Sequence, residues 1–165
     1  SNGDWSGEIF DGVGCVEAFK RRGIPIHDKR LQLIGLGGAG SAICVALAYE
    51  KPKLMRLFDI NPQTTERMVK MVNTISPQTV VEVGTPHADG INILLNASPV
   101  GMLSDSRLPL AVETFKKDLI VFDAIVMPEN TPLLTLAVNC GCQVVRGREM
   151  MLGQISKIVD YFFAP

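Results

Sequence analysis

A glycine-rich turn between an apolar run and a helical pattern constrains the fold most strongly. The residues GLGGAG (35–40) have the spacing G-x-G-x-x-G. The apolar residues LQLIG (31–35) immediately before them predict a buried strand, and residues 38–50 carry apolar side chains at helical spacing. Glycines in this spacing could serve only a tightly packed turn. Placed between a strand and a helix, they are typical of a turn that binds a dinucleotide.

Each glycine of such a turn has its own physical role. Gly35 permits the tight bend, Gly37 lets a diphosphate approach the backbone, and Gly40 lets the helix pack closely on the strand. The first turn of the helix offers unpaired N–H groups and the positive end of its dipole to phosphate oxygens. The predicted diphosphate-binding residues are Gly35, Leu36, Gly37, Gly38, Ala39 and Gly40.

An acidic residue ends the next predicted strand. Asp59 follows the last glycine by about twenty residues, the separation at which a carboxylate accepts hydrogen bonds from the adenosine ribose. The same charge would repel a 2′-phosphate, and the neighbours Ile60, Asn61 and Pro62 include no arginine. The sequence therefore predicts NAD as the cofactor in preference to NADP. The alternative is that Asp59 only caps the following helix.

The rest of the chain repeats the strand–helix unit. Strands are predicted at 31–35, 54–59, 79–83, 91–97, 119–125 and 142–147, and helices at 12–23, 38–50, 63–75, 132–140 and 149–163. In the first helix, the residues expected to share a buried face are Val13, Val16, Ala18 and Phe19. In the third, the residues expected to lie on one side of the helix are Met68, Met71, Val72 and Ile75. Near-continuous apolar strands alternating with helices predict a doubly wound parallel sheet of the Rossmann type. The 165 residues suffice for one such domain.

Composition excludes several classes of function. The net charge of −1 provides no field for nucleic acid, and no apolar run approaches the ~20 residues of a membrane span. The pair Cys140 and Cys142 could suggest a metal, but a zinc site needs about four ligands, and the two histidines lie far away in the sequence. Together with Cys15 and Cys44, these residues are predicted to be reduced thiols of a cytoplasmic protein without a metal site. The absence of an initiator Met predicts a longer parent chain or a processed start.

Four further segments resemble signatures of the shikimate/quinate dehydrogenase family. They are GDWSGEIFDGVG (3–14), NASPVGM (96–102), DAIVMPENTPLL (123–134) and GREMMLGQ (147–154), and they occur in the family's order around the glycine turn. The resemblance covers only the C-terminal cofactor-binding domain of that family. It implies that residues 1–24 link this domain to an N-terminal substrate domain, which would supply most of the substrate site, including a catalytic Lys.

The resemblance also implies roles for individual residues. Asp11 matches the catalytic Asp that works with the absent Lys in proton transfer, and Gln154 matches a substrate-contacting Gln. Val126 stands at the position of a substrate-contacting Tyr, and Phe10 stands where the family usually has Thr. The alternative for Asp11 is an N-cap that accepts an N–H bond from the following helix; both roles are compatible.

Further cofactor contacts are predicted at the ends of later strands. Open α/β sheets bind ligands at the carboxyl ends of their strands, where Asn96 and Ser98 lie. In the family, the segments around Met102 and Gly147 pass close to the nicotinamide half of the cofactor. Beyond the glycine turn, the complete predicted set is Asp59, Ile60, Asn61, Asn96, Ser98, Pro99, Met102, Ala124, Gly147 and Met150.

Two functions follow as expectations. The first is the cofactor domain of an enzyme that moves hydride between nicotinamide and a ring carbon of shikimate, quinate or a relative, and Asp11 and Gln154 favour it. The second is a non-catalytic nucleotide-binding or regulatory module, which the missing Lys and the Val at position 126 favour. The 165-residue piece is expected to bind dinucleotide without turnover. The face left by the absent domain is expected to promote self-association.

Overall fold

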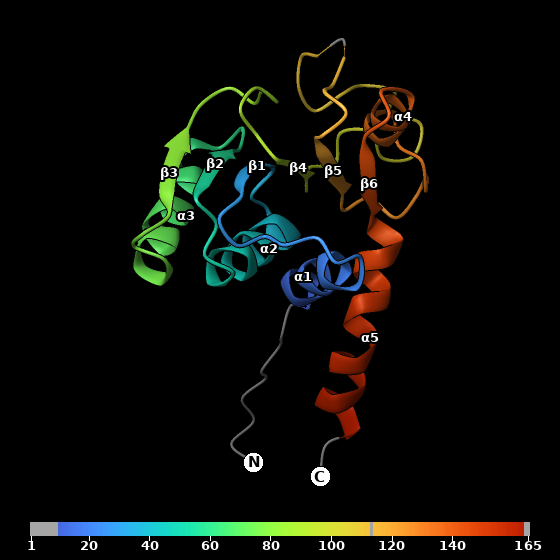
Figure 1. Cartoon of the computed structure of the whole chain (residues 1–165). Coiled ribbons are helices and arrows are strands. Elements are labelled where there is room, and N and C mark those ends of the chain that lie inside the picture. The colour runs from blue at the N-terminus through green and yellow to red at the C-terminus, as the bar shows by residue number, and fades with distance from the viewer. Residues whose placement is uncertain (1–9, 113, 164–165) are drawn as a thin grey trace.

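The computed structural model describes residues 10–112 and 114–163, with side chains as far as residue 155. Their strands form a six-stranded, wholly parallel sheet in the order β3-β2-β1-β4-β5-β6 (Figure 1). The strands are β1 (Arg30–Ile34), β2 (Leu54–Phe58), β3 (Val80–Val83), β4 (Ile93–Asn96), β5 (Ile120–Asp123) and β6 (Gln143–Arg146). The strand order reverses between β1 and β4, which creates a crevice at their carboxyl ends. The predicted Rossmann-type sheet is confirmed.

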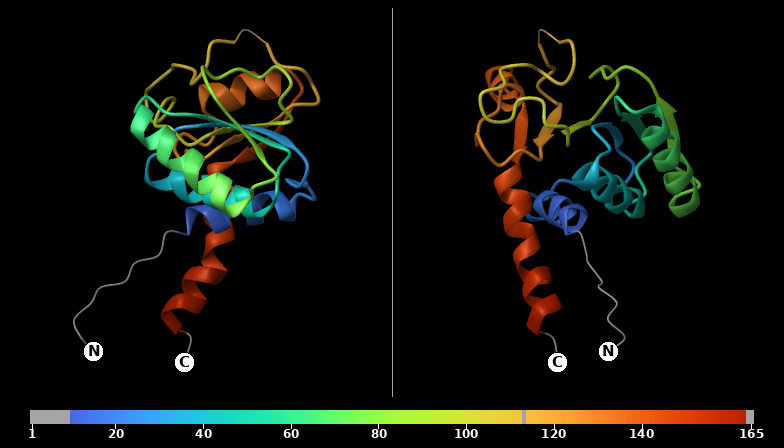
Figure 2. Two further views of the ribbon diagram at one scale, coloured as in Figure 1. Left: turned by 90° about the vertical axis from the view of Figure 1, so that its left-hand side faces the viewer. Right: turned by 180° about the vertical axis from the view of Figure 1, so that it is seen from behind.

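The helices cover the two faces of the sheet unequally. They are α1 (Asp11–Arg21), α2 (Gly38–Tyr49), α3 (Pro62–Ile75), α4 (Pro132–Asn139) and α5 (Gly147–Phe163). The helices α1, α2 and α3 and the start of α5 lie on one face, and α4 lies on the other. Figure 2 shows that α5 continues well past the layer formed by the other helices. All element bounds agree with the sequence prediction to within about two residues.

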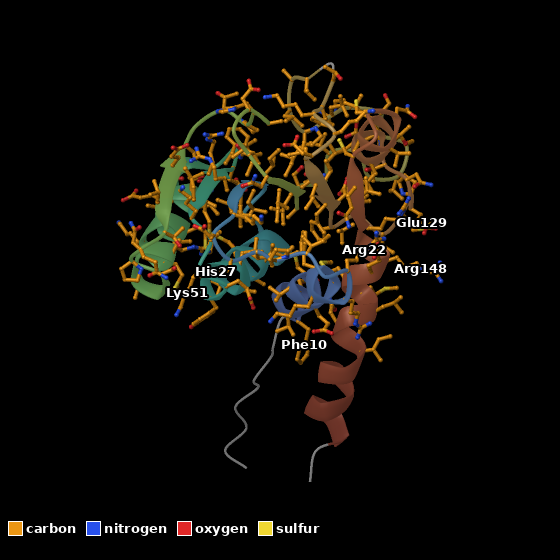
Figure 3. All side chains as sticks on the ribbon, in the orientation of Figure 1. Phe10, Arg22, His27, Lys51, Glu129 and Arg148 are labelled. Carbon is orange, nitrogen blue, oxygen red and sulfur yellow. The ribbon has the colours of Figure 1, made fainter. Side chains whose placement is uncertain are left out.

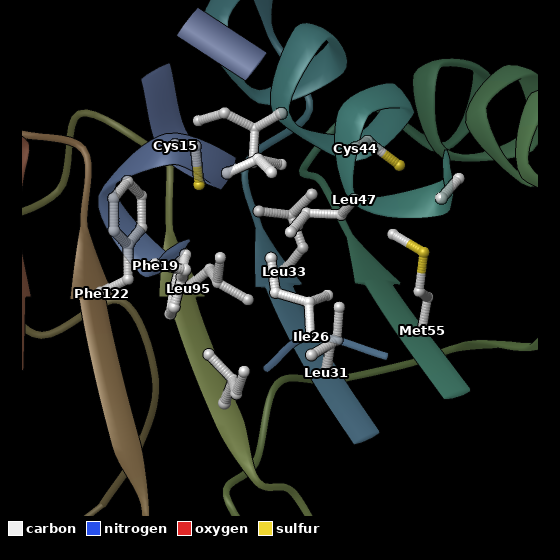
Figure 4. Packing of buried hydrophobic residues seen from close by; sticks show 14 of the residues in the cluster. Cys15, Phe19, Ile26, Leu31, Leu33, Cys44, Leu47, Met55, Leu95 and Phe122 are labelled. Carbon is white, nitrogen blue, oxygen red and sulfur yellow. The ribbon is translucent and has the colours of Figure 1, made fainter. Parts of the chain in front are cut away.

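The larger core lies on the face that carries most of the helices. Because side chains alternate along a strand, Leu33 and Leu95 point to this face, where they join Phe19 of α1 and Leu47 of α2 (Figure 4). The ring of Phe19 packs against that of Phe122, with centroids 5.7 Å apart. These side chains are at most 1% exposed, so the strands fix the position of α1 as well as that of α2.

Irregular backbone covers much of the second face. Leu94 and Val121 meet Leu133 and Leu134 of α4, and the segment 97–119 adds apolar side chains to the same cluster. Neither this segment, in its described residues, nor the connection from β3 to β4 contains a helix. The regular alternation of strand and helix therefore holds for the connections after β1, β2 and β5 but not for those after β3 and β4.

Two apolar residues of the predicted helix faces are exposed. Val13 of α1 is 42% exposed and Met71 of α3 is 43% exposed, because both line an open apolar hollow between α1, α2 and α3. The other predicted residues of the α1 face, Val16, Ala18 and Phe19, are buried, and the backbones of Gly12 and Gly14 lie against α2 and α5.

Residues 1–9 lie outside the described part of the chain, so most of the predicted 3–14 signature and the first nine residues of the 1–24 linking segment are not placed. Within the part that the structure describes, no helix has the length and apolar character that a bilayer span requires.

Candidate functional site

The glycine turn joins β1 to α2 in a conformation that only glycine fits well. Gly35 has a φ of 87°, and a Cβ there would crowd the backbone of Ser98 after β4. A Cβ on Gly40 would overlap the carbonyl oxygen of Gly35. These two glycines therefore allow the turn, α2 and the β4 loop to approach one another closely.

The other two glycines of the turn face open space. A Cβ on Gly37 or Gly38 would meet no atom within 4 Å. Gly37 is the N-cap of α2, and no side chain caps this end of the helix. The first N–H groups of α2 are thus accessible beside an unfilled space, which fits a dinucleotide diphosphate.

Asp59 connects the glycine turn to the end of β2. Its Oδ2 accepts a hydrogen bond from the Leu36 amide at 2.6 Å, and its Oδ1 accepts one from the Asn61 amide at 2.8 Å. Asn61, not Asp59, caps α3, because its side chain accepts a hydrogen bond from the Gln63 amide. Each carboxylate oxygen keeps a further acceptor position. The side chain of Ile60 beside it is 92% exposed.

A buried polar network closes the carboxyl ends of β4 and β5. Asn96 and Asp123 are both 0% exposed and lie opposite each other on the paired strands β4 and β5. Asn96 Nδ2 donates a hydrogen bond to Asp123 Oδ1 at 3.1 Å. The Thr131 hydroxyl donates to Asp123 Oδ2 at 2.7 Å, and Ser98 donates through both its amide and its hydroxyl to Asn96 Oδ1. Burial raises the pKa of Asp123 to about 6, although its hydrogen bonds with Thr131, Ile125 and Asn96 oppose the shift.

The network fixes the backbone that borders the crevice on the β5 side. A Cβ on Gly147 would overlap the carbonyl oxygens of Ala124 and Ile125, so the start of α5 lies directly against the end of β5.

Met102 is 45% exposed on the loop after β4, and Pro99 lies in the turn before it. Met150 is 5% exposed and packs in the core with α1. The structure thus brings the predicted residues after β1, β2, β4 and β5 to one edge of the sheet.

Asp11 and Gln154 meet where α1 crosses α5. Gln154 Nε2 donates to Asp11 Oδ1 at 3.0 Å. The N-cap of α1 is Phe10, and no side chain caps this helix, so the capping alternative for Asp11 is not what the structure shows. Val126, by contrast, lies half-buried in the loop after β5.

Close contacts of two α1 glycines with backbone carbonyls of the neighbouring helices let α1 lie between α2 and α5. A Cβ on Gly12 would overlap the Ala42 carbonyl oxygen of α2, and one on Gly14 would overlap the Met150 carbonyl oxygen of α5. The segment DGVG therefore sets the helix packing that places Asp11, a role that its sequence pattern did not reveal.

A second contact between α1 and α5, an ion pair, is not predicted by the sequence. Arg22 at the end of α1 donates from Nε and Nη2 to the two carboxylate oxygens of Glu149, at 2.6 and 2.9 Å, and Figure 3 shows Arg22 beside the start of α5. Glu149 also accepts a hydrogen bond from the Arg146 amide at 3.0 Å. The partners are 127 positions apart, so no local signal could pair them.

Among the described residues there is no cluster of three or more potential metal ligands.

The parallel sheet, the reversal of strand order and the open glycine turn define a Rossmann-type dinucleotide-binding fold. No model of a known protein family matches the chain. It is 33% identical over 161 residues to the shikimate dehydrogenase (NADP(+)) of Streptococcus pyogenes serotype M49, covering 90% of this chain and 55% of that protein. By this similarity the chain belongs with the shikimate/quinate dehydrogenase family, and it spans about half the length of the curated relatives it matches.

Two solved structures extend the comparison. The shikimate 5-dehydrogenase of Listeria monocytogenes, in complex with shikimate and NAD, is 29% identical and superimposes with a TM-score of 0.86 over 97% of this chain and 60% of that chain. The quinate dehydrogenase of Corynebacterium glutamicum, in complex with NAD, is 22% identical, with a TM-score of 0.82 over 96% of this chain and 58% of its own, and it supports the fold alone. Relatives of this chain thus include proteins named for NADP and proteins solved with NAD.

Proposed function

We propose that this chain is the C-terminal cofactor-binding domain of a shikimate/quinate-type dehydrogenase. The observation that carries the proposal is the accessible, uncapped start of α2 beside Gly37 and Gly38, in reach of the Asp59 carboxylate that is tied to the same turn. The similarity to shikimate dehydrogenases supports the reaction class, and the substrate class is a cyclic polyol acid such as shikimate or quinate.

The residues present fit a nicotinamide dinucleotide. The amides at the start of α2 would hold the diphosphate, Asp59 would hold the ribose hydroxyls, and the backbone around Ser98 and Gly147 would border the nicotinamide half. When bound, the nicotinamide supplies the acceptor or donor for hydride. The protein's task is to orient it and to exclude water.

Asp11 would handle the proton of the reacting hydroxyl. An alcohol that loses hydride must also lose a proton, so an acid–base group is needed within hydrogen-bond reach of it. The Gln154 amide fixes one oxygen of Asp11 and leaves the other for a partner. In the proposed whole enzyme that partner is a Lys ammonium supplied by the N-terminal domain, which would favour the charged carboxylate.

The proposal also includes a preference for NAD over NADP. The names of the relatives do not decide it, since they include both cofactors. Asp59 supports NAD, because a 2′-phosphate beside this carboxylate would be repelled. We therefore expect NAD to bind this chain more tightly than NADP.

Calorimetric titration of the folded chain tests the proposal directly. We expect saturable binding of NAD and weaker binding of NADP. Asp59→Ala should weaken NAD binding by roughly tenfold and reduce the discrimination, since it removes the ribose acceptor. Asp89→Ala, at an exposed aspartate near the amino end of β4, is the matched control and should bind like the wild type. If the wild type binds neither cofactor, the proposal is wrong.

The second candidate is a non-catalytic nucleotide-binding module. Val126 in place of the family's Tyr favours it. We expect the isolated chain to show no measurable shikimate oxidation. The reading frame upstream of Ser1 separates the two: a preceding domain of about a hundred residues with a suitable Lys supports the enzyme. Substantial turnover by the chain alone would contradict this assignment of roles.

A further inference from the structure

Cys140 and Cys142, which the proposed function does not use, lie in a defined turn after α4. The Gly141 amide donates to the Val138 carbonyl and the Cys142 amide to the Ala137 carbonyl, both at 2.9 Å, and Gly141 has a φ of 78°. This is the Schellman pattern of a helix end, so the backbone between the two cysteines is fixed. The turn leads directly into β6 and therefore lies at the amino edge of the sheet, opposite the glycine turn.

Both thiols contact the same short segment before β5. The Cys140 Sγ accepts a hydrogen bond from the Phe115 amide at 3.3 Å and lies 3.5 Å from the Thr114 hydroxyl. The Cys142 thiol donates to the Lys116 carbonyl at 3.2 Å. These partners belong to three successive residues, so both cysteine side chains contact one short segment, residues 114–116.

The two thiols differ in access and in acidity. Cys140 is half-buried, whereas Cys142 is 8% exposed. The Phe115 amide and the Thr114 hydroxyl hold the pKa of Cys140 below its ordinary value. Burial, with the nearby Cys140 and Asp118, raises the pKa of Cys142. Since the thiolate is the nucleophile, Cys140 is the thiol that a small solute would meet first, with a protonated thiol beside it.

We propose that Cys140 and Cys142 form a thiol–disulfide exchange site for low-molecular-weight disulfides. The Cys140 thiolate attacks one sulfur of the small disulfide, which releases a small thiolate and leaves a mixed disulfide on Cys140. Cys142 then loses its proton to solvent and attacks the Cys140 sulfur, which releases the second small thiolate. The two protein thiols are oxidised to one disulfide, and the small disulfide is reduced to two thiols, so electrons and atoms balance.

The remaining cysteines serve as internal controls. Cys15 and Cys44 are both 0% exposed, and burial raises the pKa of each thiol, that of Cys44 to about 12. Their thiols are therefore expected to stay unreactive while the chain is folded.

The test treats the reduced, folded full chain with oxidised glutathione and maps the products by peptide mass spectrometry. We expect a disulfide between Cys140 and Cys142, with the loss of two hydrogens in mass and with Cys15 and Cys44 still free. Cys142→Ser should stop at the mixed disulfide on Cys140. Cys140→Ser should react at least roughly tenfold more slowly, because it removes the accessible thiolate.

Two results would overturn the proposal: no linkage between Cys140 and Cys142, or equal reaction rates for wild type and Cys140→Ser. Circular dichroism of each variant establishes that it is folded before it is compared. Dinucleotide binding is measured on the same samples and should not change on oxidation, since the two sites lie at opposite edges of the sheet. Failure of thiol exchange is thereby distinguishable from failure of the proposed cofactor role.

Discussion

At the scale of single residues, the buried carboxyl of Asp123 is the most consequential feature that sequence patterns alone leave unexplained. It sits at the end of β5 with three hydrogen-bond donors around it and no cation among the partners that the structure shows. Its hydrogen bonds make the charged form tolerable, but burial prevails and raises the pKa to about 6. The stability of the domain should therefore depend on pH through this one group.

We expect Asp123 to lower stability as the pH rises from about 4 to about 6. In this window the folded state holds the proton and the unfolded state, with an ordinary value of 3.8, does not, so deprotonation favours unfolding. The full effect above pH 6 is on the order of 3 kcal/mol. Asp123→Asn has a side chain of the same shape that cannot titrate. The difference in unfolding free energy between wild type and variant should therefore change with pH between about 4 and about 6. Urea unfolding of both proteins between pH 4 and pH 7 measures it; a constant difference would contradict the assignment.

At the scale of elements, α1 packs between α2, the helix that follows the glycine turn, and the last helix α5. Its two glycines lie against backbone carbonyls of these neighbours, and Arg22 clamps its end to Glu149. The position of Asp11 depends on this packing, because its partner Gln154 comes from α5. Changes in α1 should therefore affect stability and site geometry together.

Gly14→Ala should destabilise the domain by about 1–3 kcal/mol, because the added methyl overlaps the Met150 carbonyl and the Gln154 side chain. Gly84→Ala is the matched control: a Cβ there meets nothing within 4 Å, so stability should stay close to that of the wild type. Urea unfolding followed by circular dichroism compares the three proteins. Equal stabilities would show that α1 can shift without cost, which would contradict a stabilising role for its close packing against α5.

At the scale of the whole molecule, the chain corresponds to little more than half of its relatives and leaves apolar surface uncovered. On α5, Met151, Leu152 and Ile155 are 45%, 43% and 51% exposed along one part of the helix. Neighbouring exposed apolar side chains of this kind suit a contact with another protein surface. In the isolated chain they are available to a second copy.

We expect the chain to self-associate as its concentration rises, and Ile155→Lys to weaken this association by placing a charge among the exposed apolar side chains of α5. Val80→Lys is the control, because Val80 is 55% exposed on β3, the edge strand farthest from β6 and α5 in the order of the sheet. Sedimentation velocity at several concentrations measures the effect. A monomer at every concentration, or the same change in both variants, would count against this face.

The sequence by itself determined the order of the elements, the parallel sheet and the turn at Gly35–Gly40, because these depend on local periodicity and on glycines within a few residues of one another. It also placed Asp59 beside that turn, since the strand that carries it is adjacent to β1. The exposed positions of Val13 and Met71 show where periodicity fails: it marks an apolar helix face but not which neighbour covers it.

Only the tertiary structure decided which side chains support the site. The pairs Asp11–Gln154 and Arg22–Glu149, and the link from Asn96 to Asp123, join residues far apart along the chain. The raised pKa of Asp123 results from burial of its carboxyl, which sequence spacing does not encode. The contact of Cys140 and Cys142 with one segment likewise depends on tertiary packing. Local pattern fixes what each segment becomes, whereas the packing of segments fixes the environment in which a side chain ionises, reacts or binds.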